Sequence, residues 1–227
     1  MNLDERQILL NWNDLLGAID KNFEGERKAK LKNLYERFAD RMMLAPASGI
    51  EHFHNCFAGG YVDHVLRVMD CAEQLYDLWS SMGADMSNYT KEELMFCALN
   101  HDLGKVGDNE NEYYVPNPSE WHRKNQGKIY DPNPNIQHMT VPHRSIWLLS
   151  NYGITFSQNE MIGILTHDGV YDSANDSYLK PWGKEKALWN NLPIVLHHAD
   201  HMASRIEYEN WKNKDKVKTA FSNNPKP

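Results

Sequence analysis

The sequence has few cysteines and no long hydrophobic run. Its three cysteines, Cys56, Cys71 and Cys97, are odd in number, widely spaced and form no Cys-x-x-Cys pair. A disulfide framework and a thiolate zinc site are therefore not expected, and we interpret the thiols as small apolar side chains. Because no stretch of about 18 consecutive apolar residues occurs, the sequence predicts no membrane-spanning helix.

The sequence also lacks an excess of positive charge. Its 24 lysine and arginine residues are outnumbered by 31 aspartate and glutamate residues, which gives a formal net charge of -7. No overall field favours nucleic acid, so any phosphate group has to be bound by local cations or by a metal. The first residues lack the basic start and apolar stretch of a secretory signal, which predicts a cytoplasmic protein.

A period-two alternation of apolar and polar residues is not sustained in any segment, and the chain has no internal repeat. Apolar residues recur at helical spacing instead, and capping boxes at Thr90/Glu93 and Ser157/Glu160 mark two helix starts. Helices are expected over residues 5–16, 26–43, 62–79, 90–101, 142–153, 157–168 and 192–211. The sequence therefore predicts an all-α helical bundle with long connecting loops.

Three of these predicted helices carry histidine or carboxylate groups on a core-facing side, in a chain with 11 histidines. His101 and Asp102 stand at the end of one helix, within the sequence Asn-His-Asp-Leu-Gly-Lys. His64 lies near the start of an earlier helix, and Asp200 lies beside an apolar stripe of the last one. Such groups are costly to bury unless something pairs them, so we expect the three helices to direct them into one interior.

This ordered pattern resembles the HD superfamily of metal-dependent hydrolases, in which a histidine, a His-Asp pair and a distant aspartate bind metal. His64 corresponds to the first histidine, within a GGxxxHxxRV context, and His101 and Asp102 correspond to the pair in its HDxGK form. Asp200 corresponds to the last aspartate, and the resemblance covers roughly residues 52–207. It implies an HD-domain helical bundle that hydrolyses phosphate esters.

Among the histidines between the His-Asp pair and the last aspartate, His143 and His167 are the candidates for further ligands, at the start and the end of two predicted helices. This order is similar to that of the two-metal branches of the superfamily, which include cyclic-nucleotide phosphodiesterases, and it implies that Asp102 bridges two ions. Each histidine also has a simpler interpretation. His143 lies in a first helical turn, where polar residues are tolerated, and His167 lies at a helix end, where a cation complements the dipole. The ligand types suit one or two divalent Fe, Mn, Zn, Co or Ni ions.

Hydrolysis of a phosphate ester needs an activated water and neutralised phosphoryl oxygens, both of which divalent ions supply. The resemblance implies catalytic roles for Asp102, which holds metal and orients or deprotonates the water, and for Lys105, which contacts the phosphate or the leaving oxygen. The connection over residues 107–140 is longer than a structural loop needs and is typical of a lid. With Lys105, our candidates for substrate binding are Trp121, Arg123, Lys124 and Arg144, unless this segment is a plain solvated loop.

We expect a metal-dependent phosphohydrolase or phosphodiesterase that acts on a nucleotide or another small phosphate ester. A small phosphorylated substrate is favoured over nucleic acid because the chain is acidic, and no membrane partner is expected. The alternatives are an HD-type di-iron oxygenase, an exoribonuclease-like HD nuclease and a nucleotide sensor without catalysis. The predicted division is N-terminal helices at 1–50 that pack on or extend the core, the metal-dependent hydrolase domain at 51–211 and a flexible tail at 212–227.

Overall fold

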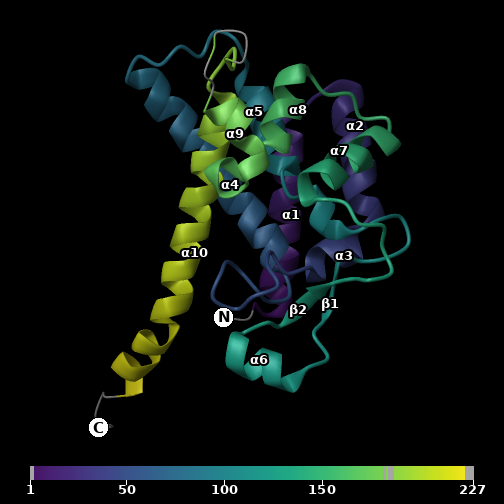
Figure 1. Cartoon of the computed structure of the whole chain (residues 1–227), viewed down its shortest axis with the longest axis vertical. Helices are drawn as coiled ribbons and strands as arrows, with labels where there is room; N and C mark the ends of the chain where they lie inside the picture. Colours follow the sequence, from purple (N-terminus) through teal and green to yellow (C-terminus); the bar gives the residue numbers. More distant parts are fainter. Residues whose placement is uncertain (1–2, 181–182, 184–186, 223–227) are drawn as a thin grey trace.

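The computed structural model describes residues 3–180, 183 and 187–222, with side chains in the last helix described to residue 213. Helices dominate it, and the long α4 and α10 pack side by side (Figure 1). The α-helices are α1 Glu5–Asn22, α2 Gly25–Arg37, α3 Ala39–Leu44, α4 Gly60–Ser81, α5 Lys91–Asn100, α6 Glu120–Gln126, α7 Val141–Asn151, α8 Gln158–Leu165, α9 Asp176–Leu179 and α10 Leu192–Ser222. Short 3-10 helices occur at η1 Leu103–Val106, η2 Gly169–Tyr171 and η3 Ser173–Asn175. The prediction of an all-α helical bundle is confirmed.

The helix starts follow the capping signals in the sequence. At the start of α5 the Thr90 hydroxyl accepts from the Glu93 backbone N–H at 3.1 Å, and the Glu93 carboxylate accepts from the Thr90 backbone at 2.9 Å. Ser157 and Glu160 form the same reciprocal pair at the start of α8. Both predicted capping boxes are confirmed. They fix the N-terminal ends of α5, which leads to the His-Asp pair, and of α8, which leads to His167.

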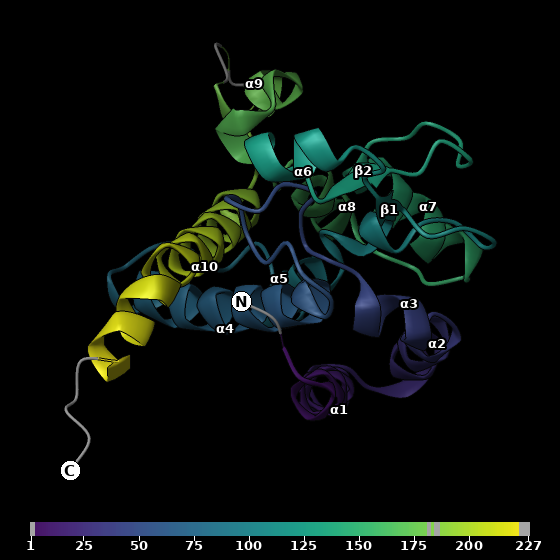
Figure 2. The same ribbon diagram turned by 90° about the horizontal axis from the view of Figure 1, so that it is seen from below.

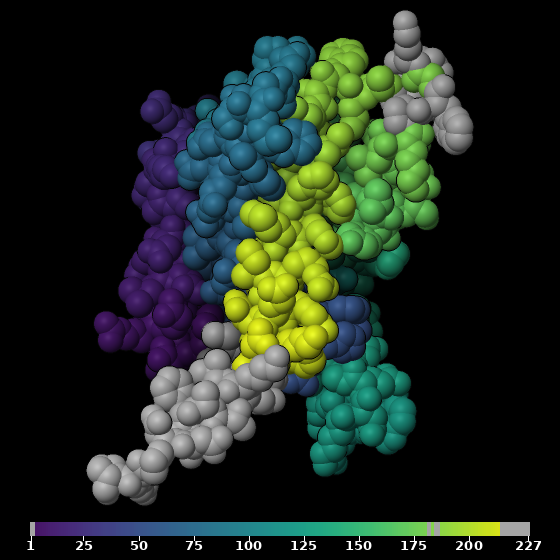
Figure 3. All heavy atoms as spheres, turned by 90° about the vertical axis from the view of Figure 1, so that its left-hand side faces the viewer, coloured from purple at the N-terminus to yellow at the C-terminus, as the bar shows by residue number. Residues whose placement is uncertain are grey.

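The core forms where α4 packs between α1 and α10 (Figure 2). Leu15, Val65 and Leu196, one from each of these helices, are fully buried. Burial of a large aliphatic side chain contributes about 1.5–3 kcal/mol, so such contacts set the position of α10 on α4. Figure 3 shows α10 running along α4 across one face of the molecule. Polar groups that α4 and α10 direct toward each other therefore lie at fixed positions.

The long connection over residues 107–140 contains regular structure that the sequence did not predict. Strand β1 Tyr114–Pro116 pairs in antiparallel fashion with β2 Tyr130–Pro132, Val115 lies opposite Asp131, and α6 lies between the strands in the chain. Strands of three residues are too short to show a period-two alternation, which explains why the pattern was absent. This small sheet is the minor β content of the described residues.

Several helix boundaries differ from the predictions, and α1, expected over residues 5–16, continues to Asn22. The helix expected over residues 26–43 is interrupted at Phe38, whose φ of -109° and ψ of 17° leave the helical range. Phe38 is buried, and the centroid of its ring lies 5.8 Å from that of Tyr152 in an edge-to-face arrangement. Tertiary packing therefore overrides the continuous helical pattern. The last helix, expected to end near residue 211, continues to Ser222. Residues 212–222 of the expected flexible tail are thus helical, and residues 223–227 lie outside the described part of the chain.

The N-terminal helices pack on the rest of the bundle through polar as well as apolar contacts. Arg27 of α2 binds both oxygens of the fully buried Glu160 at 2.7 and 2.9 Å, and its guanidinium lies over the ring of Phe96. The hydroxyl of Tyr35 donates to the backbone oxygen of Leu99 at 2.8 Å, in the helix that leads to the His-Asp pair. No described helix combines the length and the apolar character needed to cross a membrane.

Candidate metal centre

Five of the residues selected from the sequence meet in the interior of the bundle. His64 comes from the first turns of α4, His101 and Asp102 follow the last turn of α5, His167 follows α8, and Asp200 lies on α10. Ligand atoms of His64, His101 and Asp200 lie within 4.8 Å of one another, and so do those of His101, Asp102 and His167. The structure therefore contains a His/Asp cluster that can hold a metal ion, as the sequence analysis expected.

The three histidines of this cluster share one orientation. In each ring Nδ1 faces an oxygen acceptor: the backbone oxygen of Ala98 for His101 at 2.9 Å, and that of Ile164 for His167 at 2.8 Å. Nδ1 of His64 faces both carboxylate oxygens of Glu207, at 3.1 and 3.2 Å. Because a carbonyl or carboxylate oxygen can only accept, Nδ1 carries the proton, and in the neutral ring the lone pair lies on Nε2.

All three Nε2 atoms are directed toward carboxylates at the centre of the cluster. Nε2 of His64 lies 3.2 Å from Asp200 Oδ1, and Nε2 of His101 lies 3.4 Å from Asp102 Oδ2. Both of these nitrogens are buried and make no hydrogen bond within the described residues. Convergent imidazole nitrogens and carboxylate oxygens are the donor set of Fe, Mn, Zn, Co and Ni sites, so these residues fit a divalent transition metal.

The two oxygens of Asp102 face different parts of the cluster. Oδ2 accepts from Lys105 Nζ at 2.6 Å and lies 3.7 Å from His64 Nε2, whereas Oδ1 lies 3.7 Å from His167 Nε2. Asp102 is only 3% exposed and stands between the two imidazoles. This arrangement suits a carboxylate that binds one ion through one oxygen or bridges two ions through both.

The electrostatics of the cluster are those of a site that holds positive charge. Burial works to lower the pKa of His64, but the Glu207 and Asp200 carboxylates outweigh it and raise the pKa to about 10. His167 behaves in the same way, because burial is outweighed by Asp102 and Asp168 and its pKa rises to about 9. Burial works to raise the pKa of Asp200, yet His64 and the other imidazoles lower it. Without a metal, protons on the imidazoles balance the buried carboxylates.

His54 and Glu207 also belong to this neighbourhood. From the sequence, His54 was a candidate only for supporting a ligand or contacting substrate, and Glu207 had no predicted role. Burial lowers the pKa of His54 to about 3, with Lys105 and His64 adding to the effect, so this imidazole is neutral near pH 7. Glu207 is 3% exposed and its Oε1 also lies 3.3 Å from Arg67 Nε. Glu207 stands seven residues after Asp200, two helical turns along the same face of α10, and this spacing is the signal in the sequence.

His143 lies apart from the contacts described so far. It is exposed in the first turn of α7, and its Nδ1 lies 2.6 Å from the hydroxyl of Thr140. None of the groups of ligand atoms that come together within the described residues contains it. Its role as a ligand of a second ion stays a prediction, and the simpler interpretation of a polar residue in a first helical turn fits its surroundings.

The basic residues expected to bind substrate are mostly engaged with nearby groups. Arg123 donates to the backbone oxygen of Asn117, and exposed Lys124 pairs with Glu120 in the preceding turn of α6. Arg144 is 2% exposed and donates to the backbone oxygen of Gln137 at 2.9 Å. Trp121 of α6 is 60% exposed. Substrate binding by Trp121, Arg123, Lys124 and Arg144 stays a prediction.

Lys105 differs from these residues because it borders both the cluster and open space. It reaches Asp102, and it also lines a cavity of about 360 Å³ together with Tyr114, Tyr130 and Arg41. A separate cavity of about 450 Å³, lined by Tyr178, Trp189 and neighbouring residues, contains no member of the cluster. The lining of the cavity at Lys105 therefore includes a direct contact of Asp102.

Comparisons with protein-family models, with curated proteins and with solved structures found no match for this chain.

The contact between Glu207 and His64 leads to a testable expectation. A buried carboxylate that accepts from a ligand histidine fixes the ring and raises its basicity, and loss of such a contact typically weakens metal binding about 10- to 100-fold. Glu207→Gln should therefore raise the dissociation constant for the metal by about that factor. The change should be measured by chelator competition, beside the thermal midpoint of the metal-free protein.

Glu209→Gln is the matched control, because Glu209 is an exposed glutamate on the same helix. Its metal affinity should equal that of the unmodified protein. Equal affinities in Glu207→Gln and Glu209→Gln would limit Glu207 to a structural role on α10.

Proposed function

We propose that this protein is a metal-dependent phosphohydrolase of the HD type that acts on a nucleotide or another small phosphate ester. The observation that carries the proposal is the convergence of three Nε2 atoms with Asp102 and Asp200, beside a lysine that reaches the same carboxylate. The order of these residues along the chain is that of the HD pattern, and their proximity in the fold supports it. No ligand of the four-residue HD pattern is missing.

The residues of the cluster have separate tasks in this proposal. His64, His101, Asp102 and Asp200 would hold the ion, and His167 would either complete its coordination or hold a second one through Asp102. A divalent ion bound here lowers the pKa of a water molecule and neutralises phosphoryl oxygens. The carboxylate of Asp102 would orient that water or take its proton, because it lies at the centre of the cluster. Its pKa is held well below the ordinary value, so it stays ionised, which favours holding the ion and orienting the water over removing the proton.

Lys105 supplies the cation that does not depend on metal. Burial works to lower its pKa, but Asp102 outweighs burial and raises it, so the ammonium group keeps its charge at neutral pH. Its side chain borders the cavity of about 360 Å³, where a phosphoryl oxygen or the leaving oxygen can accept from Nζ. The volume suits a small ligand, and the rings of Tyr114 and Tyr130, 6.3 Å apart, can pack against its organic part.

The test is removal and restoration of metal in the purified protein. We expect hydrolysis of at least one member of a panel of nucleotides, cyclic nucleotides and simple phosphate esters, loss of that activity after chelation, and recovery with Mn²⁺, Co²⁺, Zn²⁺, Fe²⁺ or Ni²⁺. The organic products should be separated and measured as well as free phosphate, because a cyclic nucleotide is hydrolysed to a nucleoside monophosphate without release of phosphate. Asp102→Asn protein, purified in parallel, is the control for contaminating phosphatases.

Hydrolysis that persists at the same rate after chelation, or that Asp102→Asn retains, contradicts the proposal. Metal binding without hydrolysis of any member of the panel contradicts it as well. Dioxygen consumption by the iron-loaded protein, with no phosphate ester hydrolysed, would instead indicate an oxygenase.

A further inference from the structure

The segment before α4 is held in one position above the metal centre. Glu51 donates through its backbone N–H to the oxygen of Gly127 at 2.7 Å, and Ala47 donates to the oxygen of Asn55 at 3.1 Å. Ile50 forms an isolated bridge with Lys128. These bonds tie residues 47–55 both to themselves and to the connection that carries α6. In Figure 3 this segment, in dark blue, lies between α10 and α6.

Its local backbone conformation depends on Asn55, which directly follows His54, and on Gly60, the first residue of α4. Asn55 has a φ of 38°, in the left-handed region that residues other than glycine rarely adopt, and its side chain donates to Asp63 Oδ2 at 2.8 Å. Gly60 approaches so closely that a Cβ on it would lie 2.0 Å from the oxygen of Asn55. An unusual backbone conformation persists only where the surroundings impose it, so this turn holds His54 in a defined place.

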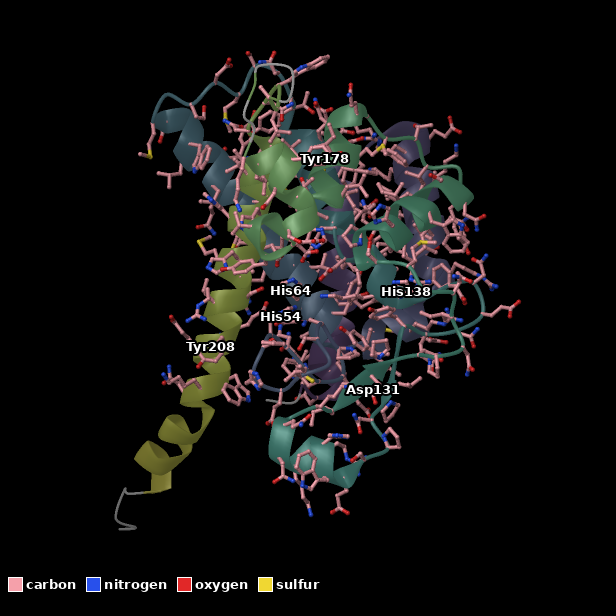
Figure 4. All side chains as sticks on the ribbon, in the orientation of Figure 1. His54, His64, Asp131, His138, Tyr178 and Tyr208 are labelled. Atoms are coloured by element: carbon pink, nitrogen blue, oxygen red, sulfur yellow. The ribbon has the colours of Figure 1, made fainter. Side chains whose placement is uncertain are left out.

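That place is the edge of the metal centre. The centroids of the His54 and His64 rings lie 4.7 Å apart, and the two labelled side chains lie next to each other in Figure 4. A ring nitrogen of His54, a ring nitrogen of His64 and a carboxylate oxygen of Asp102 lie within 4.8 Å of one another. Nε2 of His54 is buried and has no hydrogen-bond partner within the described residues. A buried nitrogen in this state requires a partner that protein atoms do not supply.

We propose that His54 is an additional ligand of the ion held by His64 and Asp102. This inference rests on the metal centre proposed above and goes beyond the HD pattern, whose first histidine is His64. Two nitrogen or oxygen donors that bind one ion at about 2.1 Å lie at most about 4.2 Å apart, so a small adjustment brings His54 into coordination. The ion is then held from the segment before α4 as well as from α4, α5 and α10.

Metal affinity and coordination test this proposal directly. His54→Ala should raise the dissociation constant for Co²⁺ or Zn²⁺ at least about tenfold. X-ray absorption of the metal-loaded protein should count one imidazole fewer than in the unmodified protein. His54→Asp should restore most of the affinity, because a carboxylate oxygen is also a ligand for these ions. His52→Ala is the matched control, since His52 is an exposed histidine of the same segment.

The outcomes separate this proposal from the proposed function. Equal affinity and equal imidazole counts in His54→Ala and His52→Ala overturn it, and a raised Michaelis constant under those conditions would assign His54 to substrate. If His54→Ala fails to fold, His54→Asp and His54→Gln decide the matter: affinity kept by Asp and lost by Gln supports ligation, and equal affinity in both overturns it. If the metal binds as described but no phosphate ester is hydrolysed, only the proposed function fails.

Discussion

Asp102→Ala is expected to abolish turnover while the helical fold is kept. Asp102 forms ion pairs with Lys105 and with the imidazoles of His64, His101 and His167. Its removal takes away the carboxylate that faces both parts of the cluster, and loss of a group that orients or transfers a proton lowers turnover by roughly 10²- to 10⁴-fold. Loss of metal would add to that effect. Hydrolysis of the best substrate from the panel and the circular dichroism spectrum should be measured on the same preparation.

Asp102→Asn is the companion variant, because alanine leaves the buried ammonium of Lys105 without its partner. Removing one member of a buried pair can cost about 3–5 kcal/mol, so Asp102→Ala could lower the thermal midpoint for a reason unrelated to catalysis. Asparagine keeps an oxygen that accepts from Lys105, yet it lacks the negative charge that binds an ion. Full turnover in either variant would remove Asp102 from the mechanism, and loss of folding in Asp102→Asn would assign it a structural role.

The sequence was sufficient to predict much of the helical bundle and the centre of the cluster. Helical spacing of apolar residues and the two capping boxes are local signals, and they place His101 and His167 at helix ends without knowledge of the fold. His64 and Asp200 were predicted through the order of the HD pattern. The proximity of His64 to Asp200 depends on how α4 packs against α10, which local periodicity does not determine.

Other features depend on contacts that no local pattern encodes. The break at Phe38 comes from packing against Tyr152, and the pairing of β1 with β2 joins strands too short to alternate. His54 reaches the centre only because the turn at Asn55 and Gly60 directs it there. No spacing in the sequence distinguishes His54 from the other histidines without an assigned ligand role, so its position at the centre becomes evident only in the folded chain.

The affinity of the centre for a divalent metal is expected to rise steeply with pH. With pKa values of about 10 and about 9, His64 and His167 are protonated at neutral pH in the metal-free protein. The titratable groups around these two imidazoles are Asp102, Asp168, Asp200, Glu207, His54 and His101. A ligand nitrogen must lose its proton, so each displaced proton should strengthen binding about tenfold per pH unit below the pKa. Two ligand histidines predict about a 100-fold rise per unit, and one predicts about tenfold.

The stability of the metal-free protein should change in the opposite direction. The folded-state pKa values of His64 and His167 lie above the ordinary value of about 6.5, so their contribution is fully present below that pH and is lost as the pH rises through about 9 to 10. Asp102 and Asp200 have lowered pKa values, so their contribution persists at high pH and is lost only in acid. Thermal midpoints should therefore fall from about pH 7 to about pH 10 with a chelator present, while metal affinity rises over the same range.

His138→Ala, which removes an exposed histidine, should leave both trends unchanged. Metal affinity that is constant across this range would mean that His64 and His167 are already neutral, and would contradict the charge balance inferred for the metal-free protein.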